Sequence, residues 1–219
     1  LYGDISNIKY LKECIPNANF IQTSFNEEPT FVKNDVNMIY MGPMTENMQE
    51  KVIKKLSQYK ERIQELINKN VVFLITGNAI EIFGKYIENE DGSRIEALGM
   101  FDIYAKRNMM KRHNSMFIGK YEDTEIVGFK SQFTLCYGNN EDCYFAEVEK
   151  GIGLNEQSKL EGIQKNNFIA TYVIGPILIL NPEFTKKILE KMEIQNPSIA
   201  FEEDVMAAYK QRLKELKKL

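Results

Sequence analysis

The amino-acid sequence predicts an α/β fold: a three-layer, doubly wound and mostly parallel sheet of the flavodoxin or Rossmann-like kind, with antiparallel strands added in the second half. Three observations lead to this prediction. Short apolar runs alternate with amphipathic helical segments up to Gly84, an order typical of parallel βαβ units. The run VVFLIT, residues 71–76, is almost entirely apolar, as expected of a strand covered on both faces. From about Gly99, short β-like runs are separated by Asn, Asp and Gly, which favours antiparallel strands.

The first elements follow from periodicity and turn residues. Apolar residues at helical spacing predict a helix over residues 5–15, with Asp4 or Ser6 as its cap. Two strands are expected next, over residues 18–25 and 36–42, and the second ends in a Gly-Pro turn.

The following segments place the turns that matter for function. A long helix capped by Thr45 is expected over residues 46–69, and a short helix after VVFLIT should end near Gly84. In doubly wound sheets, ligands bind at the carboxyl ends of the strands. The turns after Met41 and Thr76 are therefore the places where we expect a site.

The second half contains several β-like runs and two closing helices. The runs lie at residues 100–107, 115–121, 124–138 and 143–153, and residues 165–184 contain another buried strand followed by a Gly-Pro turn. The helices are expected near residues 183–193 and from about 201 to 219; the last is basic and amphipathic, which suits either a solvated terminal helix or a helix that docks a partner. Because there are no repeats, linkers or low-complexity segments, we expect residues 1–219 to form a single domain.

Composition narrows the function classes. Apolar residues make up 43% of the chain and the formal net charge is −3, which disfavours a binder of nucleic acid or of anionic membranes. No signal peptide is visible, and no apolar run approaches the roughly 18 residues that a membrane span needs. Three cysteines, an odd and low number, indicate free thiols in a reducing cytoplasm. A bridge between Cys136 and Cys143 remains a second possibility.

The single histidine, His113, restricts the available chemistry. It lies in MMKRHNSMF among polar neighbours, where we expect a solvated turn. Histidine is the commonest general base near neutral pH, so a chain with one such residue has few ways to activate a Cys or Ser nucleophile. A multi-histidine metal site is excluded, and the cysteine spacing matches no zinc pattern. We expect neither a metal nor a cofactor.

Four segments resemble, in the same order, the motifs of one enzyme family. They are LYGDISNI, IYMGPMTENMQEKVIKKL, FGKYIENEDGSRIEALGMFDIYA and GIGLNEQSKLEGIQKNNFIATYVIGPILILNP. Together they resemble class I glutamine amidotransferase-type domains of the cobyric acid synthase group, and most of all the glutaminase subunit of lipid II isoglutaminyl synthase. The resemblance implies the class I glutaminase type of α/β fold.

The resemblance also implies that the catalytic pair is absent. In active members, a Cys thiolate after a strand attacks the glutamine amide carbon, and a His transfers the proton. Matching FGK at residues 83–85 puts Gly77 at the Cys position and Asn78 at the first of two following glycines. Matching Gly-Pro at residues 175–176 puts Ile174 at the His position. A glutamine-contacting Arg of the family would fall on Leu135.

Further residues are candidates for the pocket. By resemblance, the backbone of Gly42 would help to hold the oxyanion, although the following proline has no N–H to donate. Glu46 and Glu81, expected on helices near the turn, are candidate pocket residues or solvated carboxylates. Cys136 is a candidate for a relocated nucleophile, with His113 as the only available base, or else a structural thiol.

The sequence therefore predicts a glutamine amidotransferase-like protein that has lost glutaminase activity and acts as a binding or structural subunit. The resemblance implies a Mur-ligase-like, ATP-dependent partner in the amidation of a cell-wall precursor. Two alternatives stay open: an amidotransferase or hydrolase that uses Cys136, and a sensor that binds a small amino-acid-like ligand in the former cleft. We expect no nucleic-acid partner and no membrane insertion.

Overall fold

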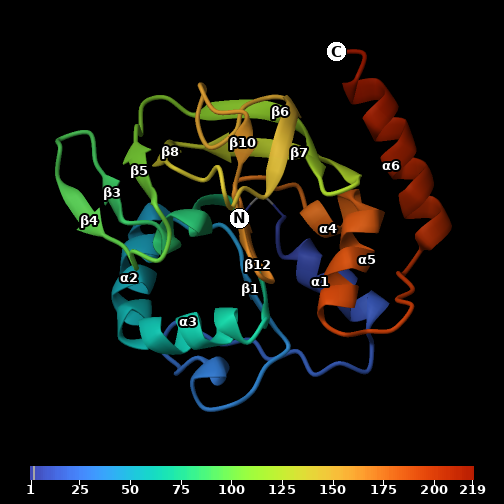
Figure 1. Ribbon diagram of the computed structural model, residues 1–219, viewed down its shortest axis with the longest axis horizontal. Coiled ribbons are helices and arrows are strands. Elements are labelled where there is room, and N and C mark those ends of the chain that lie inside the picture. Colours follow the sequence, from blue (N-terminus) through green and yellow to red (C-terminus); the bar gives the residue numbers. More distant parts are fainter. Residues whose placement is uncertain (2) are drawn as a thin grey trace.

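The computed structural model describes residues 1 and 3–219 and contains a short parallel sheet at its centre (Figure 1). Its strand order is β1-β2-β12-β11, in which the first three strands are parallel and the last is antiparallel. The bounds are β1 Met38–Met41, β2 Val72–Thr76, β11 Ile163–Lys165 and β12 Phe168–Thr171. The carboxyl ends of β1, β2 and β12 meet at one edge, because Met41 pairs with Ile75 and Thr171 pairs with Thr76.

Helices cover both faces of this sheet, which gives three layers. One face carries α2 (Glu46–Leu56), a 3-10 turn (Ser57–Tyr59) and α3 (Lys60–Asn68). The other carries α1 (Ser6–Cys14), α4 (Ile177–Leu180) and α5 (Pro182–Lys191), as Figure 1 shows. Alternate residues of β2 pack into the two layers, Phe73 and Ile75 into the first and Val72 and Leu74 into the second. This explains why the run is apolar from Val71 to Ile75.

Two further sheets are built mainly from antiparallel pairs. One has the order β4-β3-β5-β8 and the other β10-β9-β6-β7. The bounds of the first are β3 Tyr86–Glu88, β4 Arg94–Glu96, β5 Ile103–Arg107 and β8 Thr134–Gly138. Those of the second are β6 His113–Tyr121, β7 Thr124–Gln132, β9 Ala146–Lys150 and β10 Leu160–Glu161. The predicted α/β class is confirmed, but within the described residues parallel pairing is found only in the central sheet and between β3 and β5.

Two local predictions are wrong. Residues 18–25 form no strand; β1 is the edge of its sheet, and Ile21 is 58% exposed with no neighbouring strand to cover it. Neither Asp4 nor Ser6 caps α1, whose first turn has no side-chain cap. Thr45 does cap α2, accepting a hydrogen bond from the Met48 N–H at 3.4 Å, and a short 3-10 helix also spans Thr30–Val32.

The terminal helix α6 (Glu202–Leu216) packs against its own chain. Val205 and Leu216 are buried, and the Tyr209 hydroxyl donates to the backbone oxygen of Glu125 at 2.9 Å. This contact ties α6 to β7. Among the described residues, no helix has the length and apolar composition that a membrane crossing requires.

Candidate functional site

The turn after β2 has the backbone of a sharp strand-to-helix turn. Gly77 follows β2 directly and begins the 3-10 helix η3, Gly77–Phe83. Its φ is +61°, in the left-handed region that only glycine adopts without strain. A Cβ atom at this position would lie 2.6 Å from the Cβ atom of Pro43. The space in front of the turn is thus filled by the proline that follows β1.

Asn78 holds that proline in place. Its Oδ1 accepts from the Met44 N–H at 3.0 Å, and its Nδ2 donates to the Met44 carbonyl at 2.8 Å. These two hydrogen bonds to the backbone of Met44 fix the segment after β1 against the start of η3. Pro43 has no N–H to offer to a bound ligand, and Asn78 uses both ends of its amide internally.

The turn is held from behind by a buried carboxylate. Thr76 donates to Asp4 Oδ2 at 2.5 Å, and the Tyr40 hydroxyl donates to the same atom. Burial raises the pKa of the Asp4 carboxyl, while these donors act in the opposite direction. A Cβ atom on Gly42 would lie 2.9 Å from Asp4 Oδ2. Asp4 therefore joins the ends of β1 and β2, and it leaves no room for a side chain at Gly42.

Ile174 lies just after β12 and is only 2% exposed. Its backbone forms a bridge with Phe129 of β7, with N–H···O distances of 2.9 and 3.1 Å. The side chain is a hydrocarbon in the core and has no atom that could accept a proton. The neighbouring Gly128 allows this approach, because a Cβ atom there would lie 2.3 Å from Val173 Cγ1.

A chain of buried polar side chains runs beneath the turn. Cys136 Sγ and the Tyr172 hydroxyl are 3.1 Å apart, and Tyr172 donates to Glu81 Oε1 at 2.9 Å. Gln49 Nε2 donates to Glu81 Oε2 at 2.8 Å and to the backbone oxygen of Asn78 at 2.7 Å. Gln49 is thus the link between η3 and α2.

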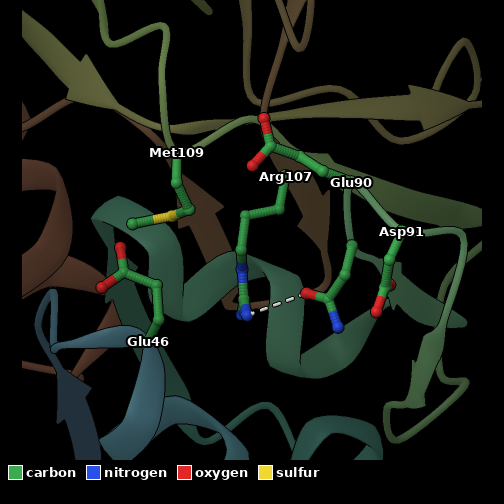
Figure 2. A pocket seen from close by; sticks show the side chains of 6 residues that line it. Glu46, Glu90, Asp91, Arg107 and Met109 are labelled. Atoms are coloured by element: carbon green, nitrogen blue, oxygen red, sulfur yellow. Dashed lines mark hydrogen bonds between the residues drawn. The ribbon is translucent and has the colours of Figure 1, made fainter.

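This row of hydrogen-bonded side chains ends, at Arg107, at an open pocket of about 380 Å³. The pocket is lined by Glu46, Asn89, Glu90, Asp91, Arg107 and Met109. Arg107 is 8% exposed and lies between Glu46 and Asp91 (Figure 2). Its guanidinium donates to Gln49 Oε1 at 3.0 Å and to Asn89 Oδ1 at 3.1 Å, and it lies 3.2 Å from Glu50 Oε1. The buried Arg107 Nε has no acceptor among the described residues.

Comparison with known proteins shows the family of the chain. The family model of CobB/CobQ-like glutamine amidotransferase domains matches residues 1–181 of the chain. The chain belongs to this family.

Two relatives are GatD subunits of lipid II isoglutaminyl synthase (glutamine-hydrolyzing). The Staphylococcus aureus protein is 29% identical over 195 residues, which is 87% of this chain and 79% of the relative. The Streptococcus pneumoniae protein is 25% identical over 219 residues, 94% of this chain and 82% of the relative. A solved structure titled as a glutamine amidotransferase matches with a TM-score of 0.51 and 12% identity, over 73% of this chain and 80% of that one. The last match supports the fold alone.

In this glutamine amidotransferase-like chain, the alternative nucleophile is not accessible. Cys136 is fully buried, and burial raises the pKa of its thiol well above the usual value. A thiol in such surroundings stays protonated and inert. Its neighbour Leu135 lies on the opposite face of β8, paired with Lys106. All three cysteines are free, so the bridge between Cys136 and Cys143 is not formed.

His113 is in a strand, not in the expected turn. It begins β6, is paired with Gln132 and has a ring nitrogen 3.0 Å from Ser115 Oγ. Partial burial and the nearby Lys130 charge lower the pKa of the imidazole. His113 is hydrogen-bonded to Ser115, whereas Cys136 is hydrogen-bonded to Tyr172, so the two residues form no pair with each other.

The predicted site residues are therefore divided between two places. Gly77 and Asn78 lie together against the segment that follows β1, whereas Glu46 lines the pocket and Glu81 is buried beneath the turn. Sequence reasoning missed three residues of the buried chain, Gln49, Tyr172 and Arg107. The first two lie within segments that resemble the family, which is the signal that could have found them. Nothing in the pattern around Arg107 distinguishes it from a surface cation.

Proposed function

We propose that this chain is a glutamine amidotransferase-like subunit without glutaminase activity. The observation that carries the proposal is the contact between Gly77 and Pro43. By resemblance, Gly77 occupies the nucleophile position, where it supplies no attacking atom. A Cβ atom added there would lie 2.6 Å from the Cβ atom of Pro43, which leaves no room for such a side chain. Nucleophile and base act as a unit, so losing one costs about as much as losing both.

The residue at the position of the family's general base also supports the proposal. Ile174, which resemblance puts in place of the His, is an apolar core residue. Cys136 is a poor substitute for the nucleophile, because a buried thiol with a raised pKa carries almost no thiolate near neutral pH. These features argue against the alternative of a relocated nucleophile.

We also propose that the chain acts by binding to a partner protein. The two relatives are named as subunits of a synthase, which supports a subunit role here. We infer a Mur-ligase-like, ATP-dependent partner that modifies a cell-wall precursor, as the resemblance implies, and a cytoplasmic location for the complex. The chain would stabilise or position its partner without supplying ammonia.

A glutaminase assay combined with a binding assay tests the proposal. The purified chain is incubated with glutamine, alone and with the candidate Mur-ligase-like protein, and released glutamate is measured against a blank without protein. We expect no release above the blank and co-elution of the two proteins on size exclusion. Glutamate release that depends on the chain contradicts the loss of activity, and separate elution contradicts the subunit role.

A second candidate function is favoured by the pocket at Arg107. A guanidinium at the wall of the pocket, with Glu46, Glu90 and Asp91 around it, suits a small ligand that carries both an oxygen acceptor and an amine. An amino-acid-like sensor would then use this pocket. A ligand at about 100 times its Kd should stabilise the fold by roughly 2.7 kcal/mol, and Glu46→Gln should reduce that shift. Amino acids that leave the unfolding temperature unchanged count against this function.

A further inference from the structure

The buried chain from Cys136 to Arg107 is not used by the proposed function. Its members come from five different parts of the fold, and Glu81, Tyr172, Gln49 and Cys136 are each at most 1% exposed. Water therefore cannot supply missing donors or acceptors to them. The direction of each hydrogen bond must follow from the protons that the side chains themselves carry.

Glu81 is the member whose proton count can change. Both of its oxygens accept hydrogen bonds, from Gln49 and from Tyr172, which suits a carboxylate. No Lys or Arg of the described residues forms an ion pair with Glu81, and Arg107 reaches it only through Gln49. Burial raises the pKa of Glu81 to about 7, although the two donors and the Arg107 charge oppose this. Both protonation states are thus populated near neutral pH.

The other groups that face this chain are few. Glu46 on α2 adds a negative charge that favours the protonated form of Glu81, and Arg107 on β5 favours the ionised form. Cys136 on β8 and Tyr172 after β12 stay protonated, because burial raises the pKa of both well above the usual values. Lys130 and Glu161, which also act on Cys136, are paired with each other.

Protonation of Glu81 leaves one acceptor for the new O–H group. Gln49 presents its Nε2 to Glu81 and its Oε1 to Arg107, so it can only donate to Glu81. The Tyr172 oxygen, 2.9 Å away, can accept. The Tyr172 hydroxyl then turns to Cys136 Sγ at 3.1 Å. When Glu81 is ionised the order is reversed, and the Cys136 S–H donates to Tyr172.

We propose that Glu81 is a reversible proton-binding site that reverses the hydrogen bond between Tyr172 and Cys136. The proton comes from solvent and no covalent bond between heavy atoms changes. Because the carboxylate lies behind Gln49, its neutralisation also removes one negative charge from beneath the Arg107 pocket. The buried side chains from Cys136 to Arg107 thus link solution pH to the charge that a ligand meets in the Arg107 pocket.

The S–H stretching band of Cys136 reports the direction of this bond. The full chain is prepared with Cys14→Ser and Cys143→Ser, which leaves Cys136 as the only thiol, and its infrared spectrum is recorded between about pH 5 and about pH 9. A thiol that donates absorbs at lower frequency than a free thiol. We expect the band to move to higher frequency as the pH falls, with a single midpoint near neutrality. A band that stays fixed over this range in the folded chain overturns the proposal.

Three variants in the same background assign the effect. Glu81→Gln should hold the band at one frequency, whereas Glu90→Gln, a rim carboxylate outside the chain, should leave the shift intact. Tyr172→Phe should also hold the band fixed, which keeps the test available if Glu81→Gln does not fold. A pH-dependent shift that survives in either of the two fixed-band variants contradicts the assignment.

Discussion

Gly77 and Pro43 are packed so closely that a Cβ atom on residue 77 would lie 2.6 Å from the Cβ atom of Pro43. The backbone of Gly77 is also in the left-handed region, with φ of +61°. Two independent constraints therefore favour glycine here, one conformational and one steric. In this respect the turn differs from Gly92, which has φ of +83° but open space around its Cβ position.

The first prediction separates these two constraints. Gly77→Ala should lose about 1–3 kcal/mol for the backbone and a further 1–3 kcal/mol or so for overpacking against Pro43. Gly92→Ala, the matched control, should show only the backbone part. Urea denaturation of both variants measures the difference. If the two lose equal stability, the contact with Pro43 has no energetic weight.

The second prediction concerns restoration of chemistry. Gly77→Cys combined with Pro43→Gly removes the clash, yet we expect no glutamate release, because Ile174 offers no base to a new thiol. Ile174→His must be added before both members of the pair are present. The assay compares the double and triple variants with the wild type. Turnover by the double variant would show that residue 174 is not the missing base.

The third prediction is a pH dependence of stability that arises from Glu81. Its pKa is about 7 in the folded chain against an ordinary value of 4.5 for a glutamate side chain, so the folded state holds the proton more tightly than the unfolded state. Stability from this group is present below the unfolded pKa and is lost as the pH rises through about 7. This difference between the folded and unfolded pKa values of Glu81 corresponds to a change of about 3 kcal/mol at most in the free energy of unfolding.

Chemical denaturation across this pH range checks the third prediction. Glu81→Gln carries no titratable group, so its stability should change less between acidic and alkaline pH than that of the wild type. The sign decides the matter: a wild type that gains stability relative to Glu81→Gln as the pH rises contradicts the assignment.

The fourth prediction concerns the ion pair between Lys130 and Glu161. Both side chains are fully buried, Lys130 also donates to the Gly153 carbonyl at 2.7 Å, and Glu161 accepts from the Tyr172 N–H at 2.8 Å. Lys130→Met leaves a buried carboxylate without its cation and should cost roughly 3–5 kcal/mol.

Two comparisons check the fourth prediction. Adding Glu161→Gln to Lys130→Met should recover part of the lost stability, because the unpaired charge is gone. Lys33→Met, which breaks the exposed pair with Glu28, should change stability little or not at all. Equal losses for Lys130→Met and Lys33→Met in urea denaturation would rule out this account of the buried pair.

The central sheet could be predicted from the sequence because its signals are local. β2 is apolar at every position from Val72 to Ile75, and Thr45 is a helix cap recognisable from its neighbours. The segment at residues 18–25 carried the same kind of signal, but it pairs with no strand and β1 stays the edge of its sheet. Strand formation depends on a partner, which local pattern does not reveal.

The buried chain could not be predicted, because its contacts join residues that are far apart in the sequence. Glu81 was expected on a helix surface, but η3 is a 3-10 helix in which every residue except Asn78 is buried. Its turn of about three residues points Glu81 inward, toward Tyr172, 91 positions away. Family resemblance located Gly77 and Ile174, but it carried no information about what packs against them.

Covalent labelling tests the absence of a nucleophile most directly. The native chain is incubated with an electrophilic glutamine analogue, alone and with its candidate partner, and its intact mass is measured. We predict no adduct on the folded chain, whereas denaturation should expose all three cysteines to a general thiol reagent. A stoichiometric adduct on native Cys136, or on any residue beside Gly77, would contradict the proposal that this site has lost its chemistry.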